Sequence, residues 1–158
     1  MNKYLKIVSF VTICLAVGYL SSMVTQTSIN TWYPTLEKPF FNPPNWVFGP
    51  VWTILYILMG VSAGLVWDKL NTNTELVKKG LLFFTVQLVL NALWSYLFFG
   101  LCNLLLASIE ILLLLLLIYE TYLLFKKIDK TAGLLFIPYI IWVAFASLLT
   151  ITIFVINF

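Results

Sequence analysis

Polar and aromatic residues share one side of a long apolar segment, residues 80–101. Amides can hydrogen-bond a ligand and aromatic rings can stack on one, so this side has the chemistry of a binding surface. Amides in an apolar environment need partners, so we expect the face to look into a helix bundle. It is either a polar contact between helices or one wall of a ligand pocket, and the residues alone leave both open. Its members, at helical spacing, are Gln87, Asn91, Trp94, Ser95 and Phe98.

Two further apolar segments, residues 46–67 and 132–156, carry aromatic and small residues at helical spacing. Each set therefore lies on one face of a helix. An indole or phenol ring can stack on a flat ligand and still offer a polar atom at its edge. These faces could supply the other walls of a pocket. Their members are Trp52, Tyr56, Trp142, Phe145 and Ala146.

One carboxyl group, that of Glu110, falls inside an apolar segment that covers residues 104–125. An ionisable group at membrane depth is costly unless it faces the bundle interior or water. Glu110 can be a neutral acid hydrogen-bonded to a neighbour, or it can line a ligand pocket. In either case we expect it to face the bundle and to be neutral.

The chain has no histidine, which restricts its chemistry. Imidazole cannot ligate haem here, and no serine or cysteine can be paired with a histidine base. Cys14 lies in the first apolar segment and Cys102 far along the chain, without metal-ligand spacing, so we expect neither a metal site nor a disulfide. The sequence has no phosphate-binding or dinucleotide motif, and we expect no nucleic-acid partner.

Composition places the chain in a membrane. Of its 158 residues, 62% are hydrophobic and 9% are charged, whereas soluble domains carry about 25% charged residues. Five apolar segments are each long enough to cross the ~30 Å bilayer core as a helix. We therefore predict a single all-α domain, an integral-membrane bundle of five helices. The segments are residues 5–24, 46–67, 80–101, 104–125 and 132–156, although the first one also suits a signal peptide.

The lysines are unequally divided between the two sides of this predicted bundle. The amino terminus and the loops after the second and fourth segments hold eight of the nine, whereas the other side has only Lys38. Short basic loops are retained in the cytoplasm. We therefore expect a cytoplasmic amino terminus and an outward carboxyl terminus. All basic residues are lysines and none is arginine, which is typical of an AT-rich bacterial genome, so we expect a bacterial cell membrane.

The loop between the first two segments, residues 26–45, is rich in proline and aromatic residues. Proline fixes φ and removes a backbone donor, which favours a stiff, non-helical path. One interpretation is an aromatic belt at the membrane interface joined to a proline-rich turn. The other is a structured lid over a pocket between the helices, with Trp32 and Tyr33 as its cap.

Together these residues resemble the translocator protein family, also called tryptophan-rich sensory proteins or peripheral-type benzodiazepine receptors. The resemblance runs from the first loop to the last helix and rests on the combination of motifs. Leu149-Thr150 departs from the Leu-Asn pair that is usual in the family, and no Lys or Arg follows Tyr139, so the cholesterol-recognition segment of animal members has no counterpart. The matching positions are Trp32-Tyr33, Leu36, Lys38-Pro39, Pro43-Pro44, Trp46 to Tyr56, Gly60, Asn91 with Trp94, Ala107 with Glu110, and Pro138-Tyr139 with Trp142, Phe145 and Ala146.

The resemblance implies a five-helix bundle, usually a homodimer, that binds tetrapyrroles such as protoporphyrin IX and isoquinoline-carboxamide or benzodiazepine-type drugs. No cofactor is required, and porphyrin is a ligand. In bacterial members, tryptophans at positions like Trp52 and Trp142 are associated with light- and oxygen-dependent porphyrin breakdown. The ligand-binding residues expected under the lid are Trp32, Tyr33, Pro43, Trp52, Tyr56, Gln87, Asn91, Trp94, Phe98, Glu110, Trp142, Phe145 and Ala146.

Three functions remain open at this point. The protein can be a tetrapyrrole receptor with photochemical turnover, a transporter of porphyrin or another amphiphile, or a regulator that senses membrane lipid or a drug-like molecule and acts through a partner. No acid–base pair or metal would be needed for the photochemistry, because indole is among the most easily oxidised side chains.

Overall fold

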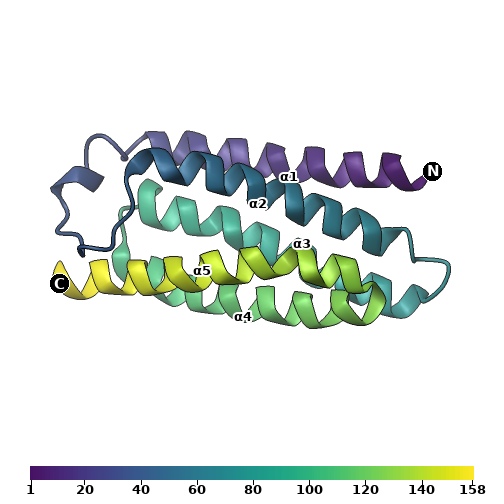
Figure 1. Cartoon of the computed structure of the whole chain (residues 1–158). Coiled ribbons are helices and arrows are strands. Elements are labelled where there is room, and N and C mark those ends of the chain that lie inside the picture. Colours follow the sequence, from purple (N-terminus) through teal and green to yellow (C-terminus); the bar gives the residue numbers. More distant parts are fainter.

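Helices make up almost the whole chain. The computed structural model describes residues 1–158 and has five long helices, α1 (Lys3–Gln26), α2 (Asn45–Trp67), α3 (Thr74–Ser95), α4 (Leu104–Ile128) and α5 (Lys130–Ile156) (Figure 1). A π-helical turn, Tyr96–Gly100, continues α3 toward α4. All five helices are long and apolar enough to cross a membrane. The predicted all-α, membrane-spanning fold is therefore confirmed.

Side-chain caps set the start of three helices. Asn2 caps α1, Asn103 caps α4 and Asp129 caps α5; each accepts a hydrogen bond from a backbone N–H three residues further on, at 2.8, 3.0 and 2.9 Å. Such a cap satisfies one of the donors that the first helical turn leaves free. Pro44 stands directly before α2, where a missing N–H costs little. The caps at Asn103 and Asp129 therefore let α4 and α5 begin directly after short connections.

Two predicted loops are shorter in the structure than in the sequence prediction. The helix expected at residues 80–101 already begins at Thr74, because its polar first turns extend the helix beyond the apolar stretch. The loop expected at residues 126–130 is reduced to Asp129, which ends α4 and caps α5 at once. Pro138, which could have opened a kink, lies within α5, and the helix continues through it.

The two ends of the bundle differ in what they carry (Figure 1). One end holds the amino terminus, the α2–α3 connection and the α4–α5 connection, and we call it the lysine end. The other holds the carboxyl terminus, the tight α3–α4 turn and the long first loop, and we call it the lid end. The lid, residues 27–44, contains one short 3₁₀ turn at Tyr33–Thr35. The bundle is therefore polarised along its axis.

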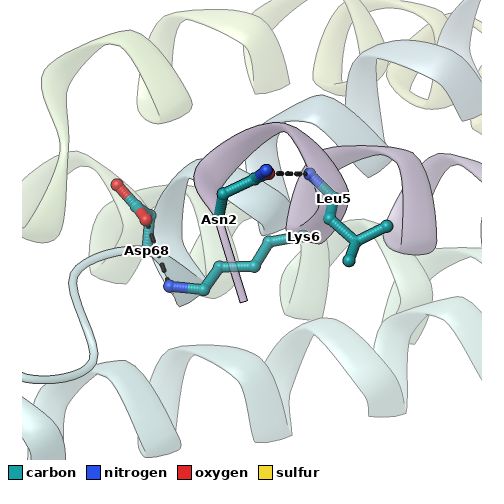
Figure 2. A network of polar contacts seen from close by, with 4 residues as sticks. All are labelled: Asn2, Leu5, Lys6 and Asp68. Carbon is teal, nitrogen blue, oxygen red and sulfur yellow. Dashed lines mark hydrogen bonds and ion pairs between the residues drawn. The ribbon is translucent and has the colours of Figure 1, made fainter.

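An ion pair joins α1 to α2 at the lysine end. The Nζ of Lys6 lies 3.1 Å from the Oδ1 of Asp68, beside the Asn2 cap of α1 (Figure 2). The same ammonium lies 5.9 Å from the ring centroid of Trp67. Both charged side chains are partly buried, so the start of α1 is fixed against the end of α2.

Glycines bring α1 and α2 into close contact along this half of the bundle. A Cβ atom added at Gly60 would overlap the backbone of Val11, and one added at Gly64 would overlap the backbone of Ile7. Small residues at such positions let two membrane helices approach backbone to backbone. The four-residue spacing of Gly60 and Gly64 in α2 therefore selects the face on which α1 packs.

We expect Gly60→Ala to lower the free energy of unfolding by about 1–3 kcal/mol, because the new methyl group would be forced against the Val11 backbone. Gly49→Ala is the matched control, since a Cβ at Gly49 meets nothing within 4 Å. Thermal unfolding of both variants in the same detergent measures the difference. Equal stability of the two variants would contradict the close approach of α1 and α2.

The lysine asymmetry also gives a topology prediction. A reporter that is active only outside the cytoplasm, fused after Phe158, should be active in bacterial cells, because the carboxyl terminus lies at the end opposite the lysines. The same reporter fused before Met1 should be silent. The reverse pattern would show that the basic loops do not set the orientation.

Candidate ligand-binding cavity

A cavity of about 730 Å³ lies inside the lid end of the bundle. All five helices and the lid contribute to its lining. Ligand pockets in proteins commonly measure about 300–1,000 Å³. Most of its lining residues are hydrophobic, and none of them carries a charge. The cavity therefore suits a mainly apolar molecule of drug or pigment size.

The structure brings many of the sequence-predicted site residues to the cavity wall. The lid contributes a phenol ring, α2 an indole and a phenol, α3 an amide and an indole, and α5 an indole and a small residue. The π-helical turn after α3 also places its rings here. The lining residues that sequence reasoning singled out are Tyr33, Trp52, Tyr56, Asn91, Trp94, Phe98, Trp142 and Ala146, together with Ser95.

The remaining predicted residues do not line the cavity. The Trp32 ring packs edge-on against Phe98, with centroids 5.6 Å apart. The Phe145 ring lies 5.6 Å from that of Trp142, and Gln87 is fully buried one turn below Asn91. Other members of this group are Pro43, in the lid just before α2, and Glu110, in α4.

A chain of hydrogen bonds closes the bottom of the cavity. The Tyr56 hydroxyl donates to the Asn91 Oδ1 at 2.6 Å, and the Asn91 Nδ2 donates to the Tyr139 hydroxyl at 2.8 Å. The Tyr139 hydroxyl in turn donates to the Gln87 Oε1 at 2.7 Å. All four side chains are buried. The amide face of α3 is thus a polar contact between α2, α3 and α5, and Asn91 lines the cavity as well.

We expect Asn91→Leu to destabilise the protein, because the buried hydroxyls of Tyr56 and Tyr139 each lose a partner. Leaving a buried polar group unsatisfied costs about 1–3 kcal/mol. The measurement is thermal unfolding, with ligand titration alongside. Thr85→Val, on an exposed part of α3 with only a bond to its own helix, is the control. An unchanged melting temperature for Asn91→Leu would contradict the network.

Indole rings form the walls above this network. The Trp52 ring lies 5.7 Å from the Tyr56 ring and 6.3 Å from the Tyr139 ring. On α3 and the π-helical turn that follows it, the rings of Trp94 and Phe98 stack, with centroids 5.0 Å apart and planes 24° apart. The Trp142 ring packs against that of Phe48 in α2, with the ring centroids 6.2 Å apart. A flat ligand would therefore meet aromatic faces from three helices.

Tyr33 fixes the lid over the cavity. It is 3% exposed, and its hydroxyl donates to the Asn42 Oδ1 at 2.9 Å. Its ring packs against Phe98 and Phe99, and the Lys38 ammonium lies 4.7 Å from the ring centroid. Burial raises the pKa of the Tyr33 phenol, and the hydrogen bond with Asn42 opposes that rise.

Two contacts that sequence reasoning missed hold the lid to the bundle. The Asn157 side chain accepts from the Glu37 backbone N–H at 2.9 Å and donates to the Glu37 carbonyl at 2.8 Å. Near the start of the lid, the Ser28 hydroxyl donates to the carbonyl of Phe99. These partners are far apart in the sequence, so no local pattern marks them.

Sequence reasoning also missed the part that α1 plays in the cavity. The last turns of α1 contribute small and polar lining residues, and the signal that could have found them is their gathering at the end of an otherwise apolar segment. Gly18 allows this approach, because a Cβ there would fall within 3 Å of the Tyr56 ring. The polar members are Ser21, Ser22, Thr25 and Gln26.

Glu110 is buried, as expected, with 7% of its surface exposed. Neither of its carboxyl oxygens has a hydrogen-bond partner within the chain, so the expected neighbour that would bond a neutral acid is not seen. The nearby lining residues from α4 are instead Ile111 and Leu114. A carboxylate here would have no counter-charge.

We therefore expect Glu110→Gln to keep the stability and ligand affinity of the wild type. Glutamine has the same size and cannot ionise, so nothing is lost if the native group is the neutral acid. Thermal unfolding at several pH values measures this. A large loss of stability in the Gln variant would show that an ionised carboxylate is used.

A polarised five-helix membrane bundle, with an uncharged aromatic cavity beneath a fixed loop, is the architecture of a membrane sensory or binding protein. The chain belongs to the TspO/MBR family, whose model matches residues 10–156. It is 44% identical to the tryptophan-rich protein TspO of Archaeoglobus fulgidus over 97% of both chains. It is 41% identical to the protein of the same name from Chlorobaculum tepidum over 99% of both chains. Identity to the human translocator protein is 38%, over 75% of this chain and 70% of the human one.

Proposed function

We propose that this protein binds a flat tetrapyrrole such as protoporphyrin IX in the cavity beneath the lid. The observation that carries the proposal is the set of aromatic rings from α2, α3 and α5 around one uncharged space of about 730 Å³. Aromatic faces stack on a porphyrin at little entropic cost. Drug-like molecules of the isoquinoline-carboxamide and benzodiazepine type suit the same walls.

The chemistry of the ligand follows from the lining residues. With no histidine in the chain, the cavity favours a metal-free ring over haem. With no charged lining residue, the ring itself occupies the cavity and ionised groups stay outside it. The floor of hydrogen bonds gives the ligand a rigid base, since Tyr56, Asn91 and Tyr139 already satisfy one another.

The same arrangement supports a photochemical reaction. A porphyrin excited by light is a strong oxidant, and indole is an easily oxidised side chain. Trp52 and Trp142 both line the cavity, so both would lie beside a bound ring. Transfer of an electron from an indole to the excited ring would leave an indole radical cation and a porphyrin radical anion. Molecular oxygen, the oxidant, would then add to the reduced ring, and the indole would recover its electron from the oxygenated ring, so that the net change is addition of O₂ to the porphyrin and loss of its conjugated ring.

The test compares binding with light-driven decay. We expect Trp52→Phe and Trp142→Phe to keep most of the stacking area, so affinity should fall less than about tenfold, or ~1.4 kcal/mol, when an indole becomes a phenyl ring. In the double variant, the decay of porphyrin absorbance under fixed illumination in air should slow by much more than tenfold. The measurement is made at equal occupancy, with affinity titrated separately.

Trp67→Phe serves as the control, because Trp67 lies at the lysine end beside Lys6 and does not line the cavity. It should leave both binding and decay unchanged. Equal decay in the wild type and the double variant would show that the protein binds porphyrin without reacting with it.

A transporter of porphyrin or another amphiphile is the second candidate, and the translocator name of the human relative favours it. Flux of porphyrin into sealed liposomes that contain the protein separates transport from binding. Flux in the dark that exceeds the rate of protein-free liposomes would support transport, whereas decay without flux would support the photochemical receptor.

A further inference from the structure

The wall of the cavity is incomplete between α1 and α2. The lining residues that are also exposed lie on two facing stripes, one on the last turns of α1 and one on the first turns of α2, with Asn30 of the lid at one end. We call this opening the α1–α2 mouth. Its members are Leu15, Tyr19, Ser22, Gln26, Asn30, Asn45, Trp46, Gly49 and Thr53.

The mouth is bounded toward the lysine end by direct contact of the two helices. One turn before Leu15, Val11 packs so closely on Gly60 that a Cβ added at Gly60 would overlap the Val11 backbone. From Leu15 to Gln26, at about 1.5 Å per residue, the stripe on α1 spans roughly 16 Å. This is about half of the ~30 Å bilayer core. The mouth therefore opens toward the lipid of one leaflet as well as toward its interface.

No residue at the rim of the mouth is charged, and most of the rim side chains are polar. Polar side chains in membrane helices usually face the bundle or a water-filled cavity, whereas Ser22, Gln26 and Thr53 are exposed on the outside. The hydroxyls of Ser22 and Thr53 donate to carbonyls of their own helices at 2.7 and 2.8 Å. Their oxygens keep a free lone pair for a donor that passes between the helices.

The lid end offers a more restricted route. To open there, the lid would have to break the two Asn157–Glu37 hydrogen bonds, the Ser28 bond to Phe99 and the burial of Tyr33. Passage through the mouth requires none of these changes. The side of Gly49 that faces the mouth is empty, because a Cβ there meets no atom within 4 Å.

We propose that the ligand enters the cavity sideways from the bilayer, through the α1–α2 mouth, while the lid stays in place. This inference rests on the proposed ligand binding. It also defines the ligand further: a flat amphiphile that dissolves in the membrane, whose apolar body passes inward while its polar or ionised groups remain at the mouth. The uncharged inner cavity favours that orientation, and the side-chain amides of Gln26, Asn30 and Asn45 at the rim can donate to an ionised group there.

The experiment follows the entry of protoporphyrin IX from liposomes into reconstituted protein, by the quenching of tryptophan fluorescence in a stopped-flow instrument. Gly49→Phe fills the mouth, and Thr53→Phe narrows the same rim from a second position. Val89→Phe, on an exposed part of α3 away from the cavity, is the matched control. Asn157→Leu releases the lid without touching the mouth.

We expect Gly49→Phe and Thr53→Phe each to slow both association and dissociation by roughly tenfold, as an obstructed entry path does. Val89→Phe and Asn157→Leu should behave like the wild type. Unchanged association in both mouth variants, or faster association in Asn157→Leu, would overturn the proposed route.

Two other outcomes distinguish the inference from the proposed function. A mouth variant that binds at the wild-type rate and dissociates faster would show that the residue belongs to the binding site, and the route would be overturned while the function stood. No quenching of the wild type at any porphyrin concentration would overturn both. A melting temperature for each variant in detergent confirms that the compared proteins are folded.

Discussion

The hydrogen bonds around Asn91 hold the ligand end of this bundle together. One amide, on α3, accepts from a tyrosine of α2 and donates to a tyrosine of α5. Both phenols are buried, so each needs a polar partner, and in the apolar interior only another side chain can supply it. The three helices are consequently fixed at one depth, and everything nearer the lid is built on this layer.

The position of this layer divides the bundle into two halves with different packing. Toward the lysine end, glycines of α2 admit the backbone of α1, and a stack of phenylalanine rings fills the interior, as in the Phe84–Phe125 pair at 5.9 Å. Toward the lid end, aromatic rings line an open space. The close contact of α1 in one half and its separation from α2 in the other follow from where the small residues are placed.

Electrostatics complements this division. Apart from Glu110 and Glu120 of α4, the Lys, Asp and Glu side chains lie at the ends and on the lid, and the one ion pair is at the lysine end. The cavity has only neutral polar groups. A membrane protein that binds its ligand by stacking gains specificity from ring placement and hydrogen bonds, because an unpaired charge at that depth would be expensive. The lid adds to this rigidity through Tyr33 and Asn157.

The sequence by itself determined the number and identity of the helices, their direction in relation to the lysines, and the aromatic faces of α2, α3 and α5. These features are local: a helix of about 3.6 residues per turn converts spacing directly into a face. The family resemblance came from the same faces and from the loop motifs, and the match over residues 10–156 bears it out.

Tertiary structure decided which of these residues reach the cavity. Gln87 and Asn91 lie on one face of α3, yet only Asn91 lines the cavity, because Tyr139 of α5 covers Gln87. The contact face of α1 was decided in the same way, because the glycines of α2 select the side on which α1 packs. Asn157 and Glu37 are 120 residues apart in sequence, and only the folded bundle brings the end of α5 against the lid.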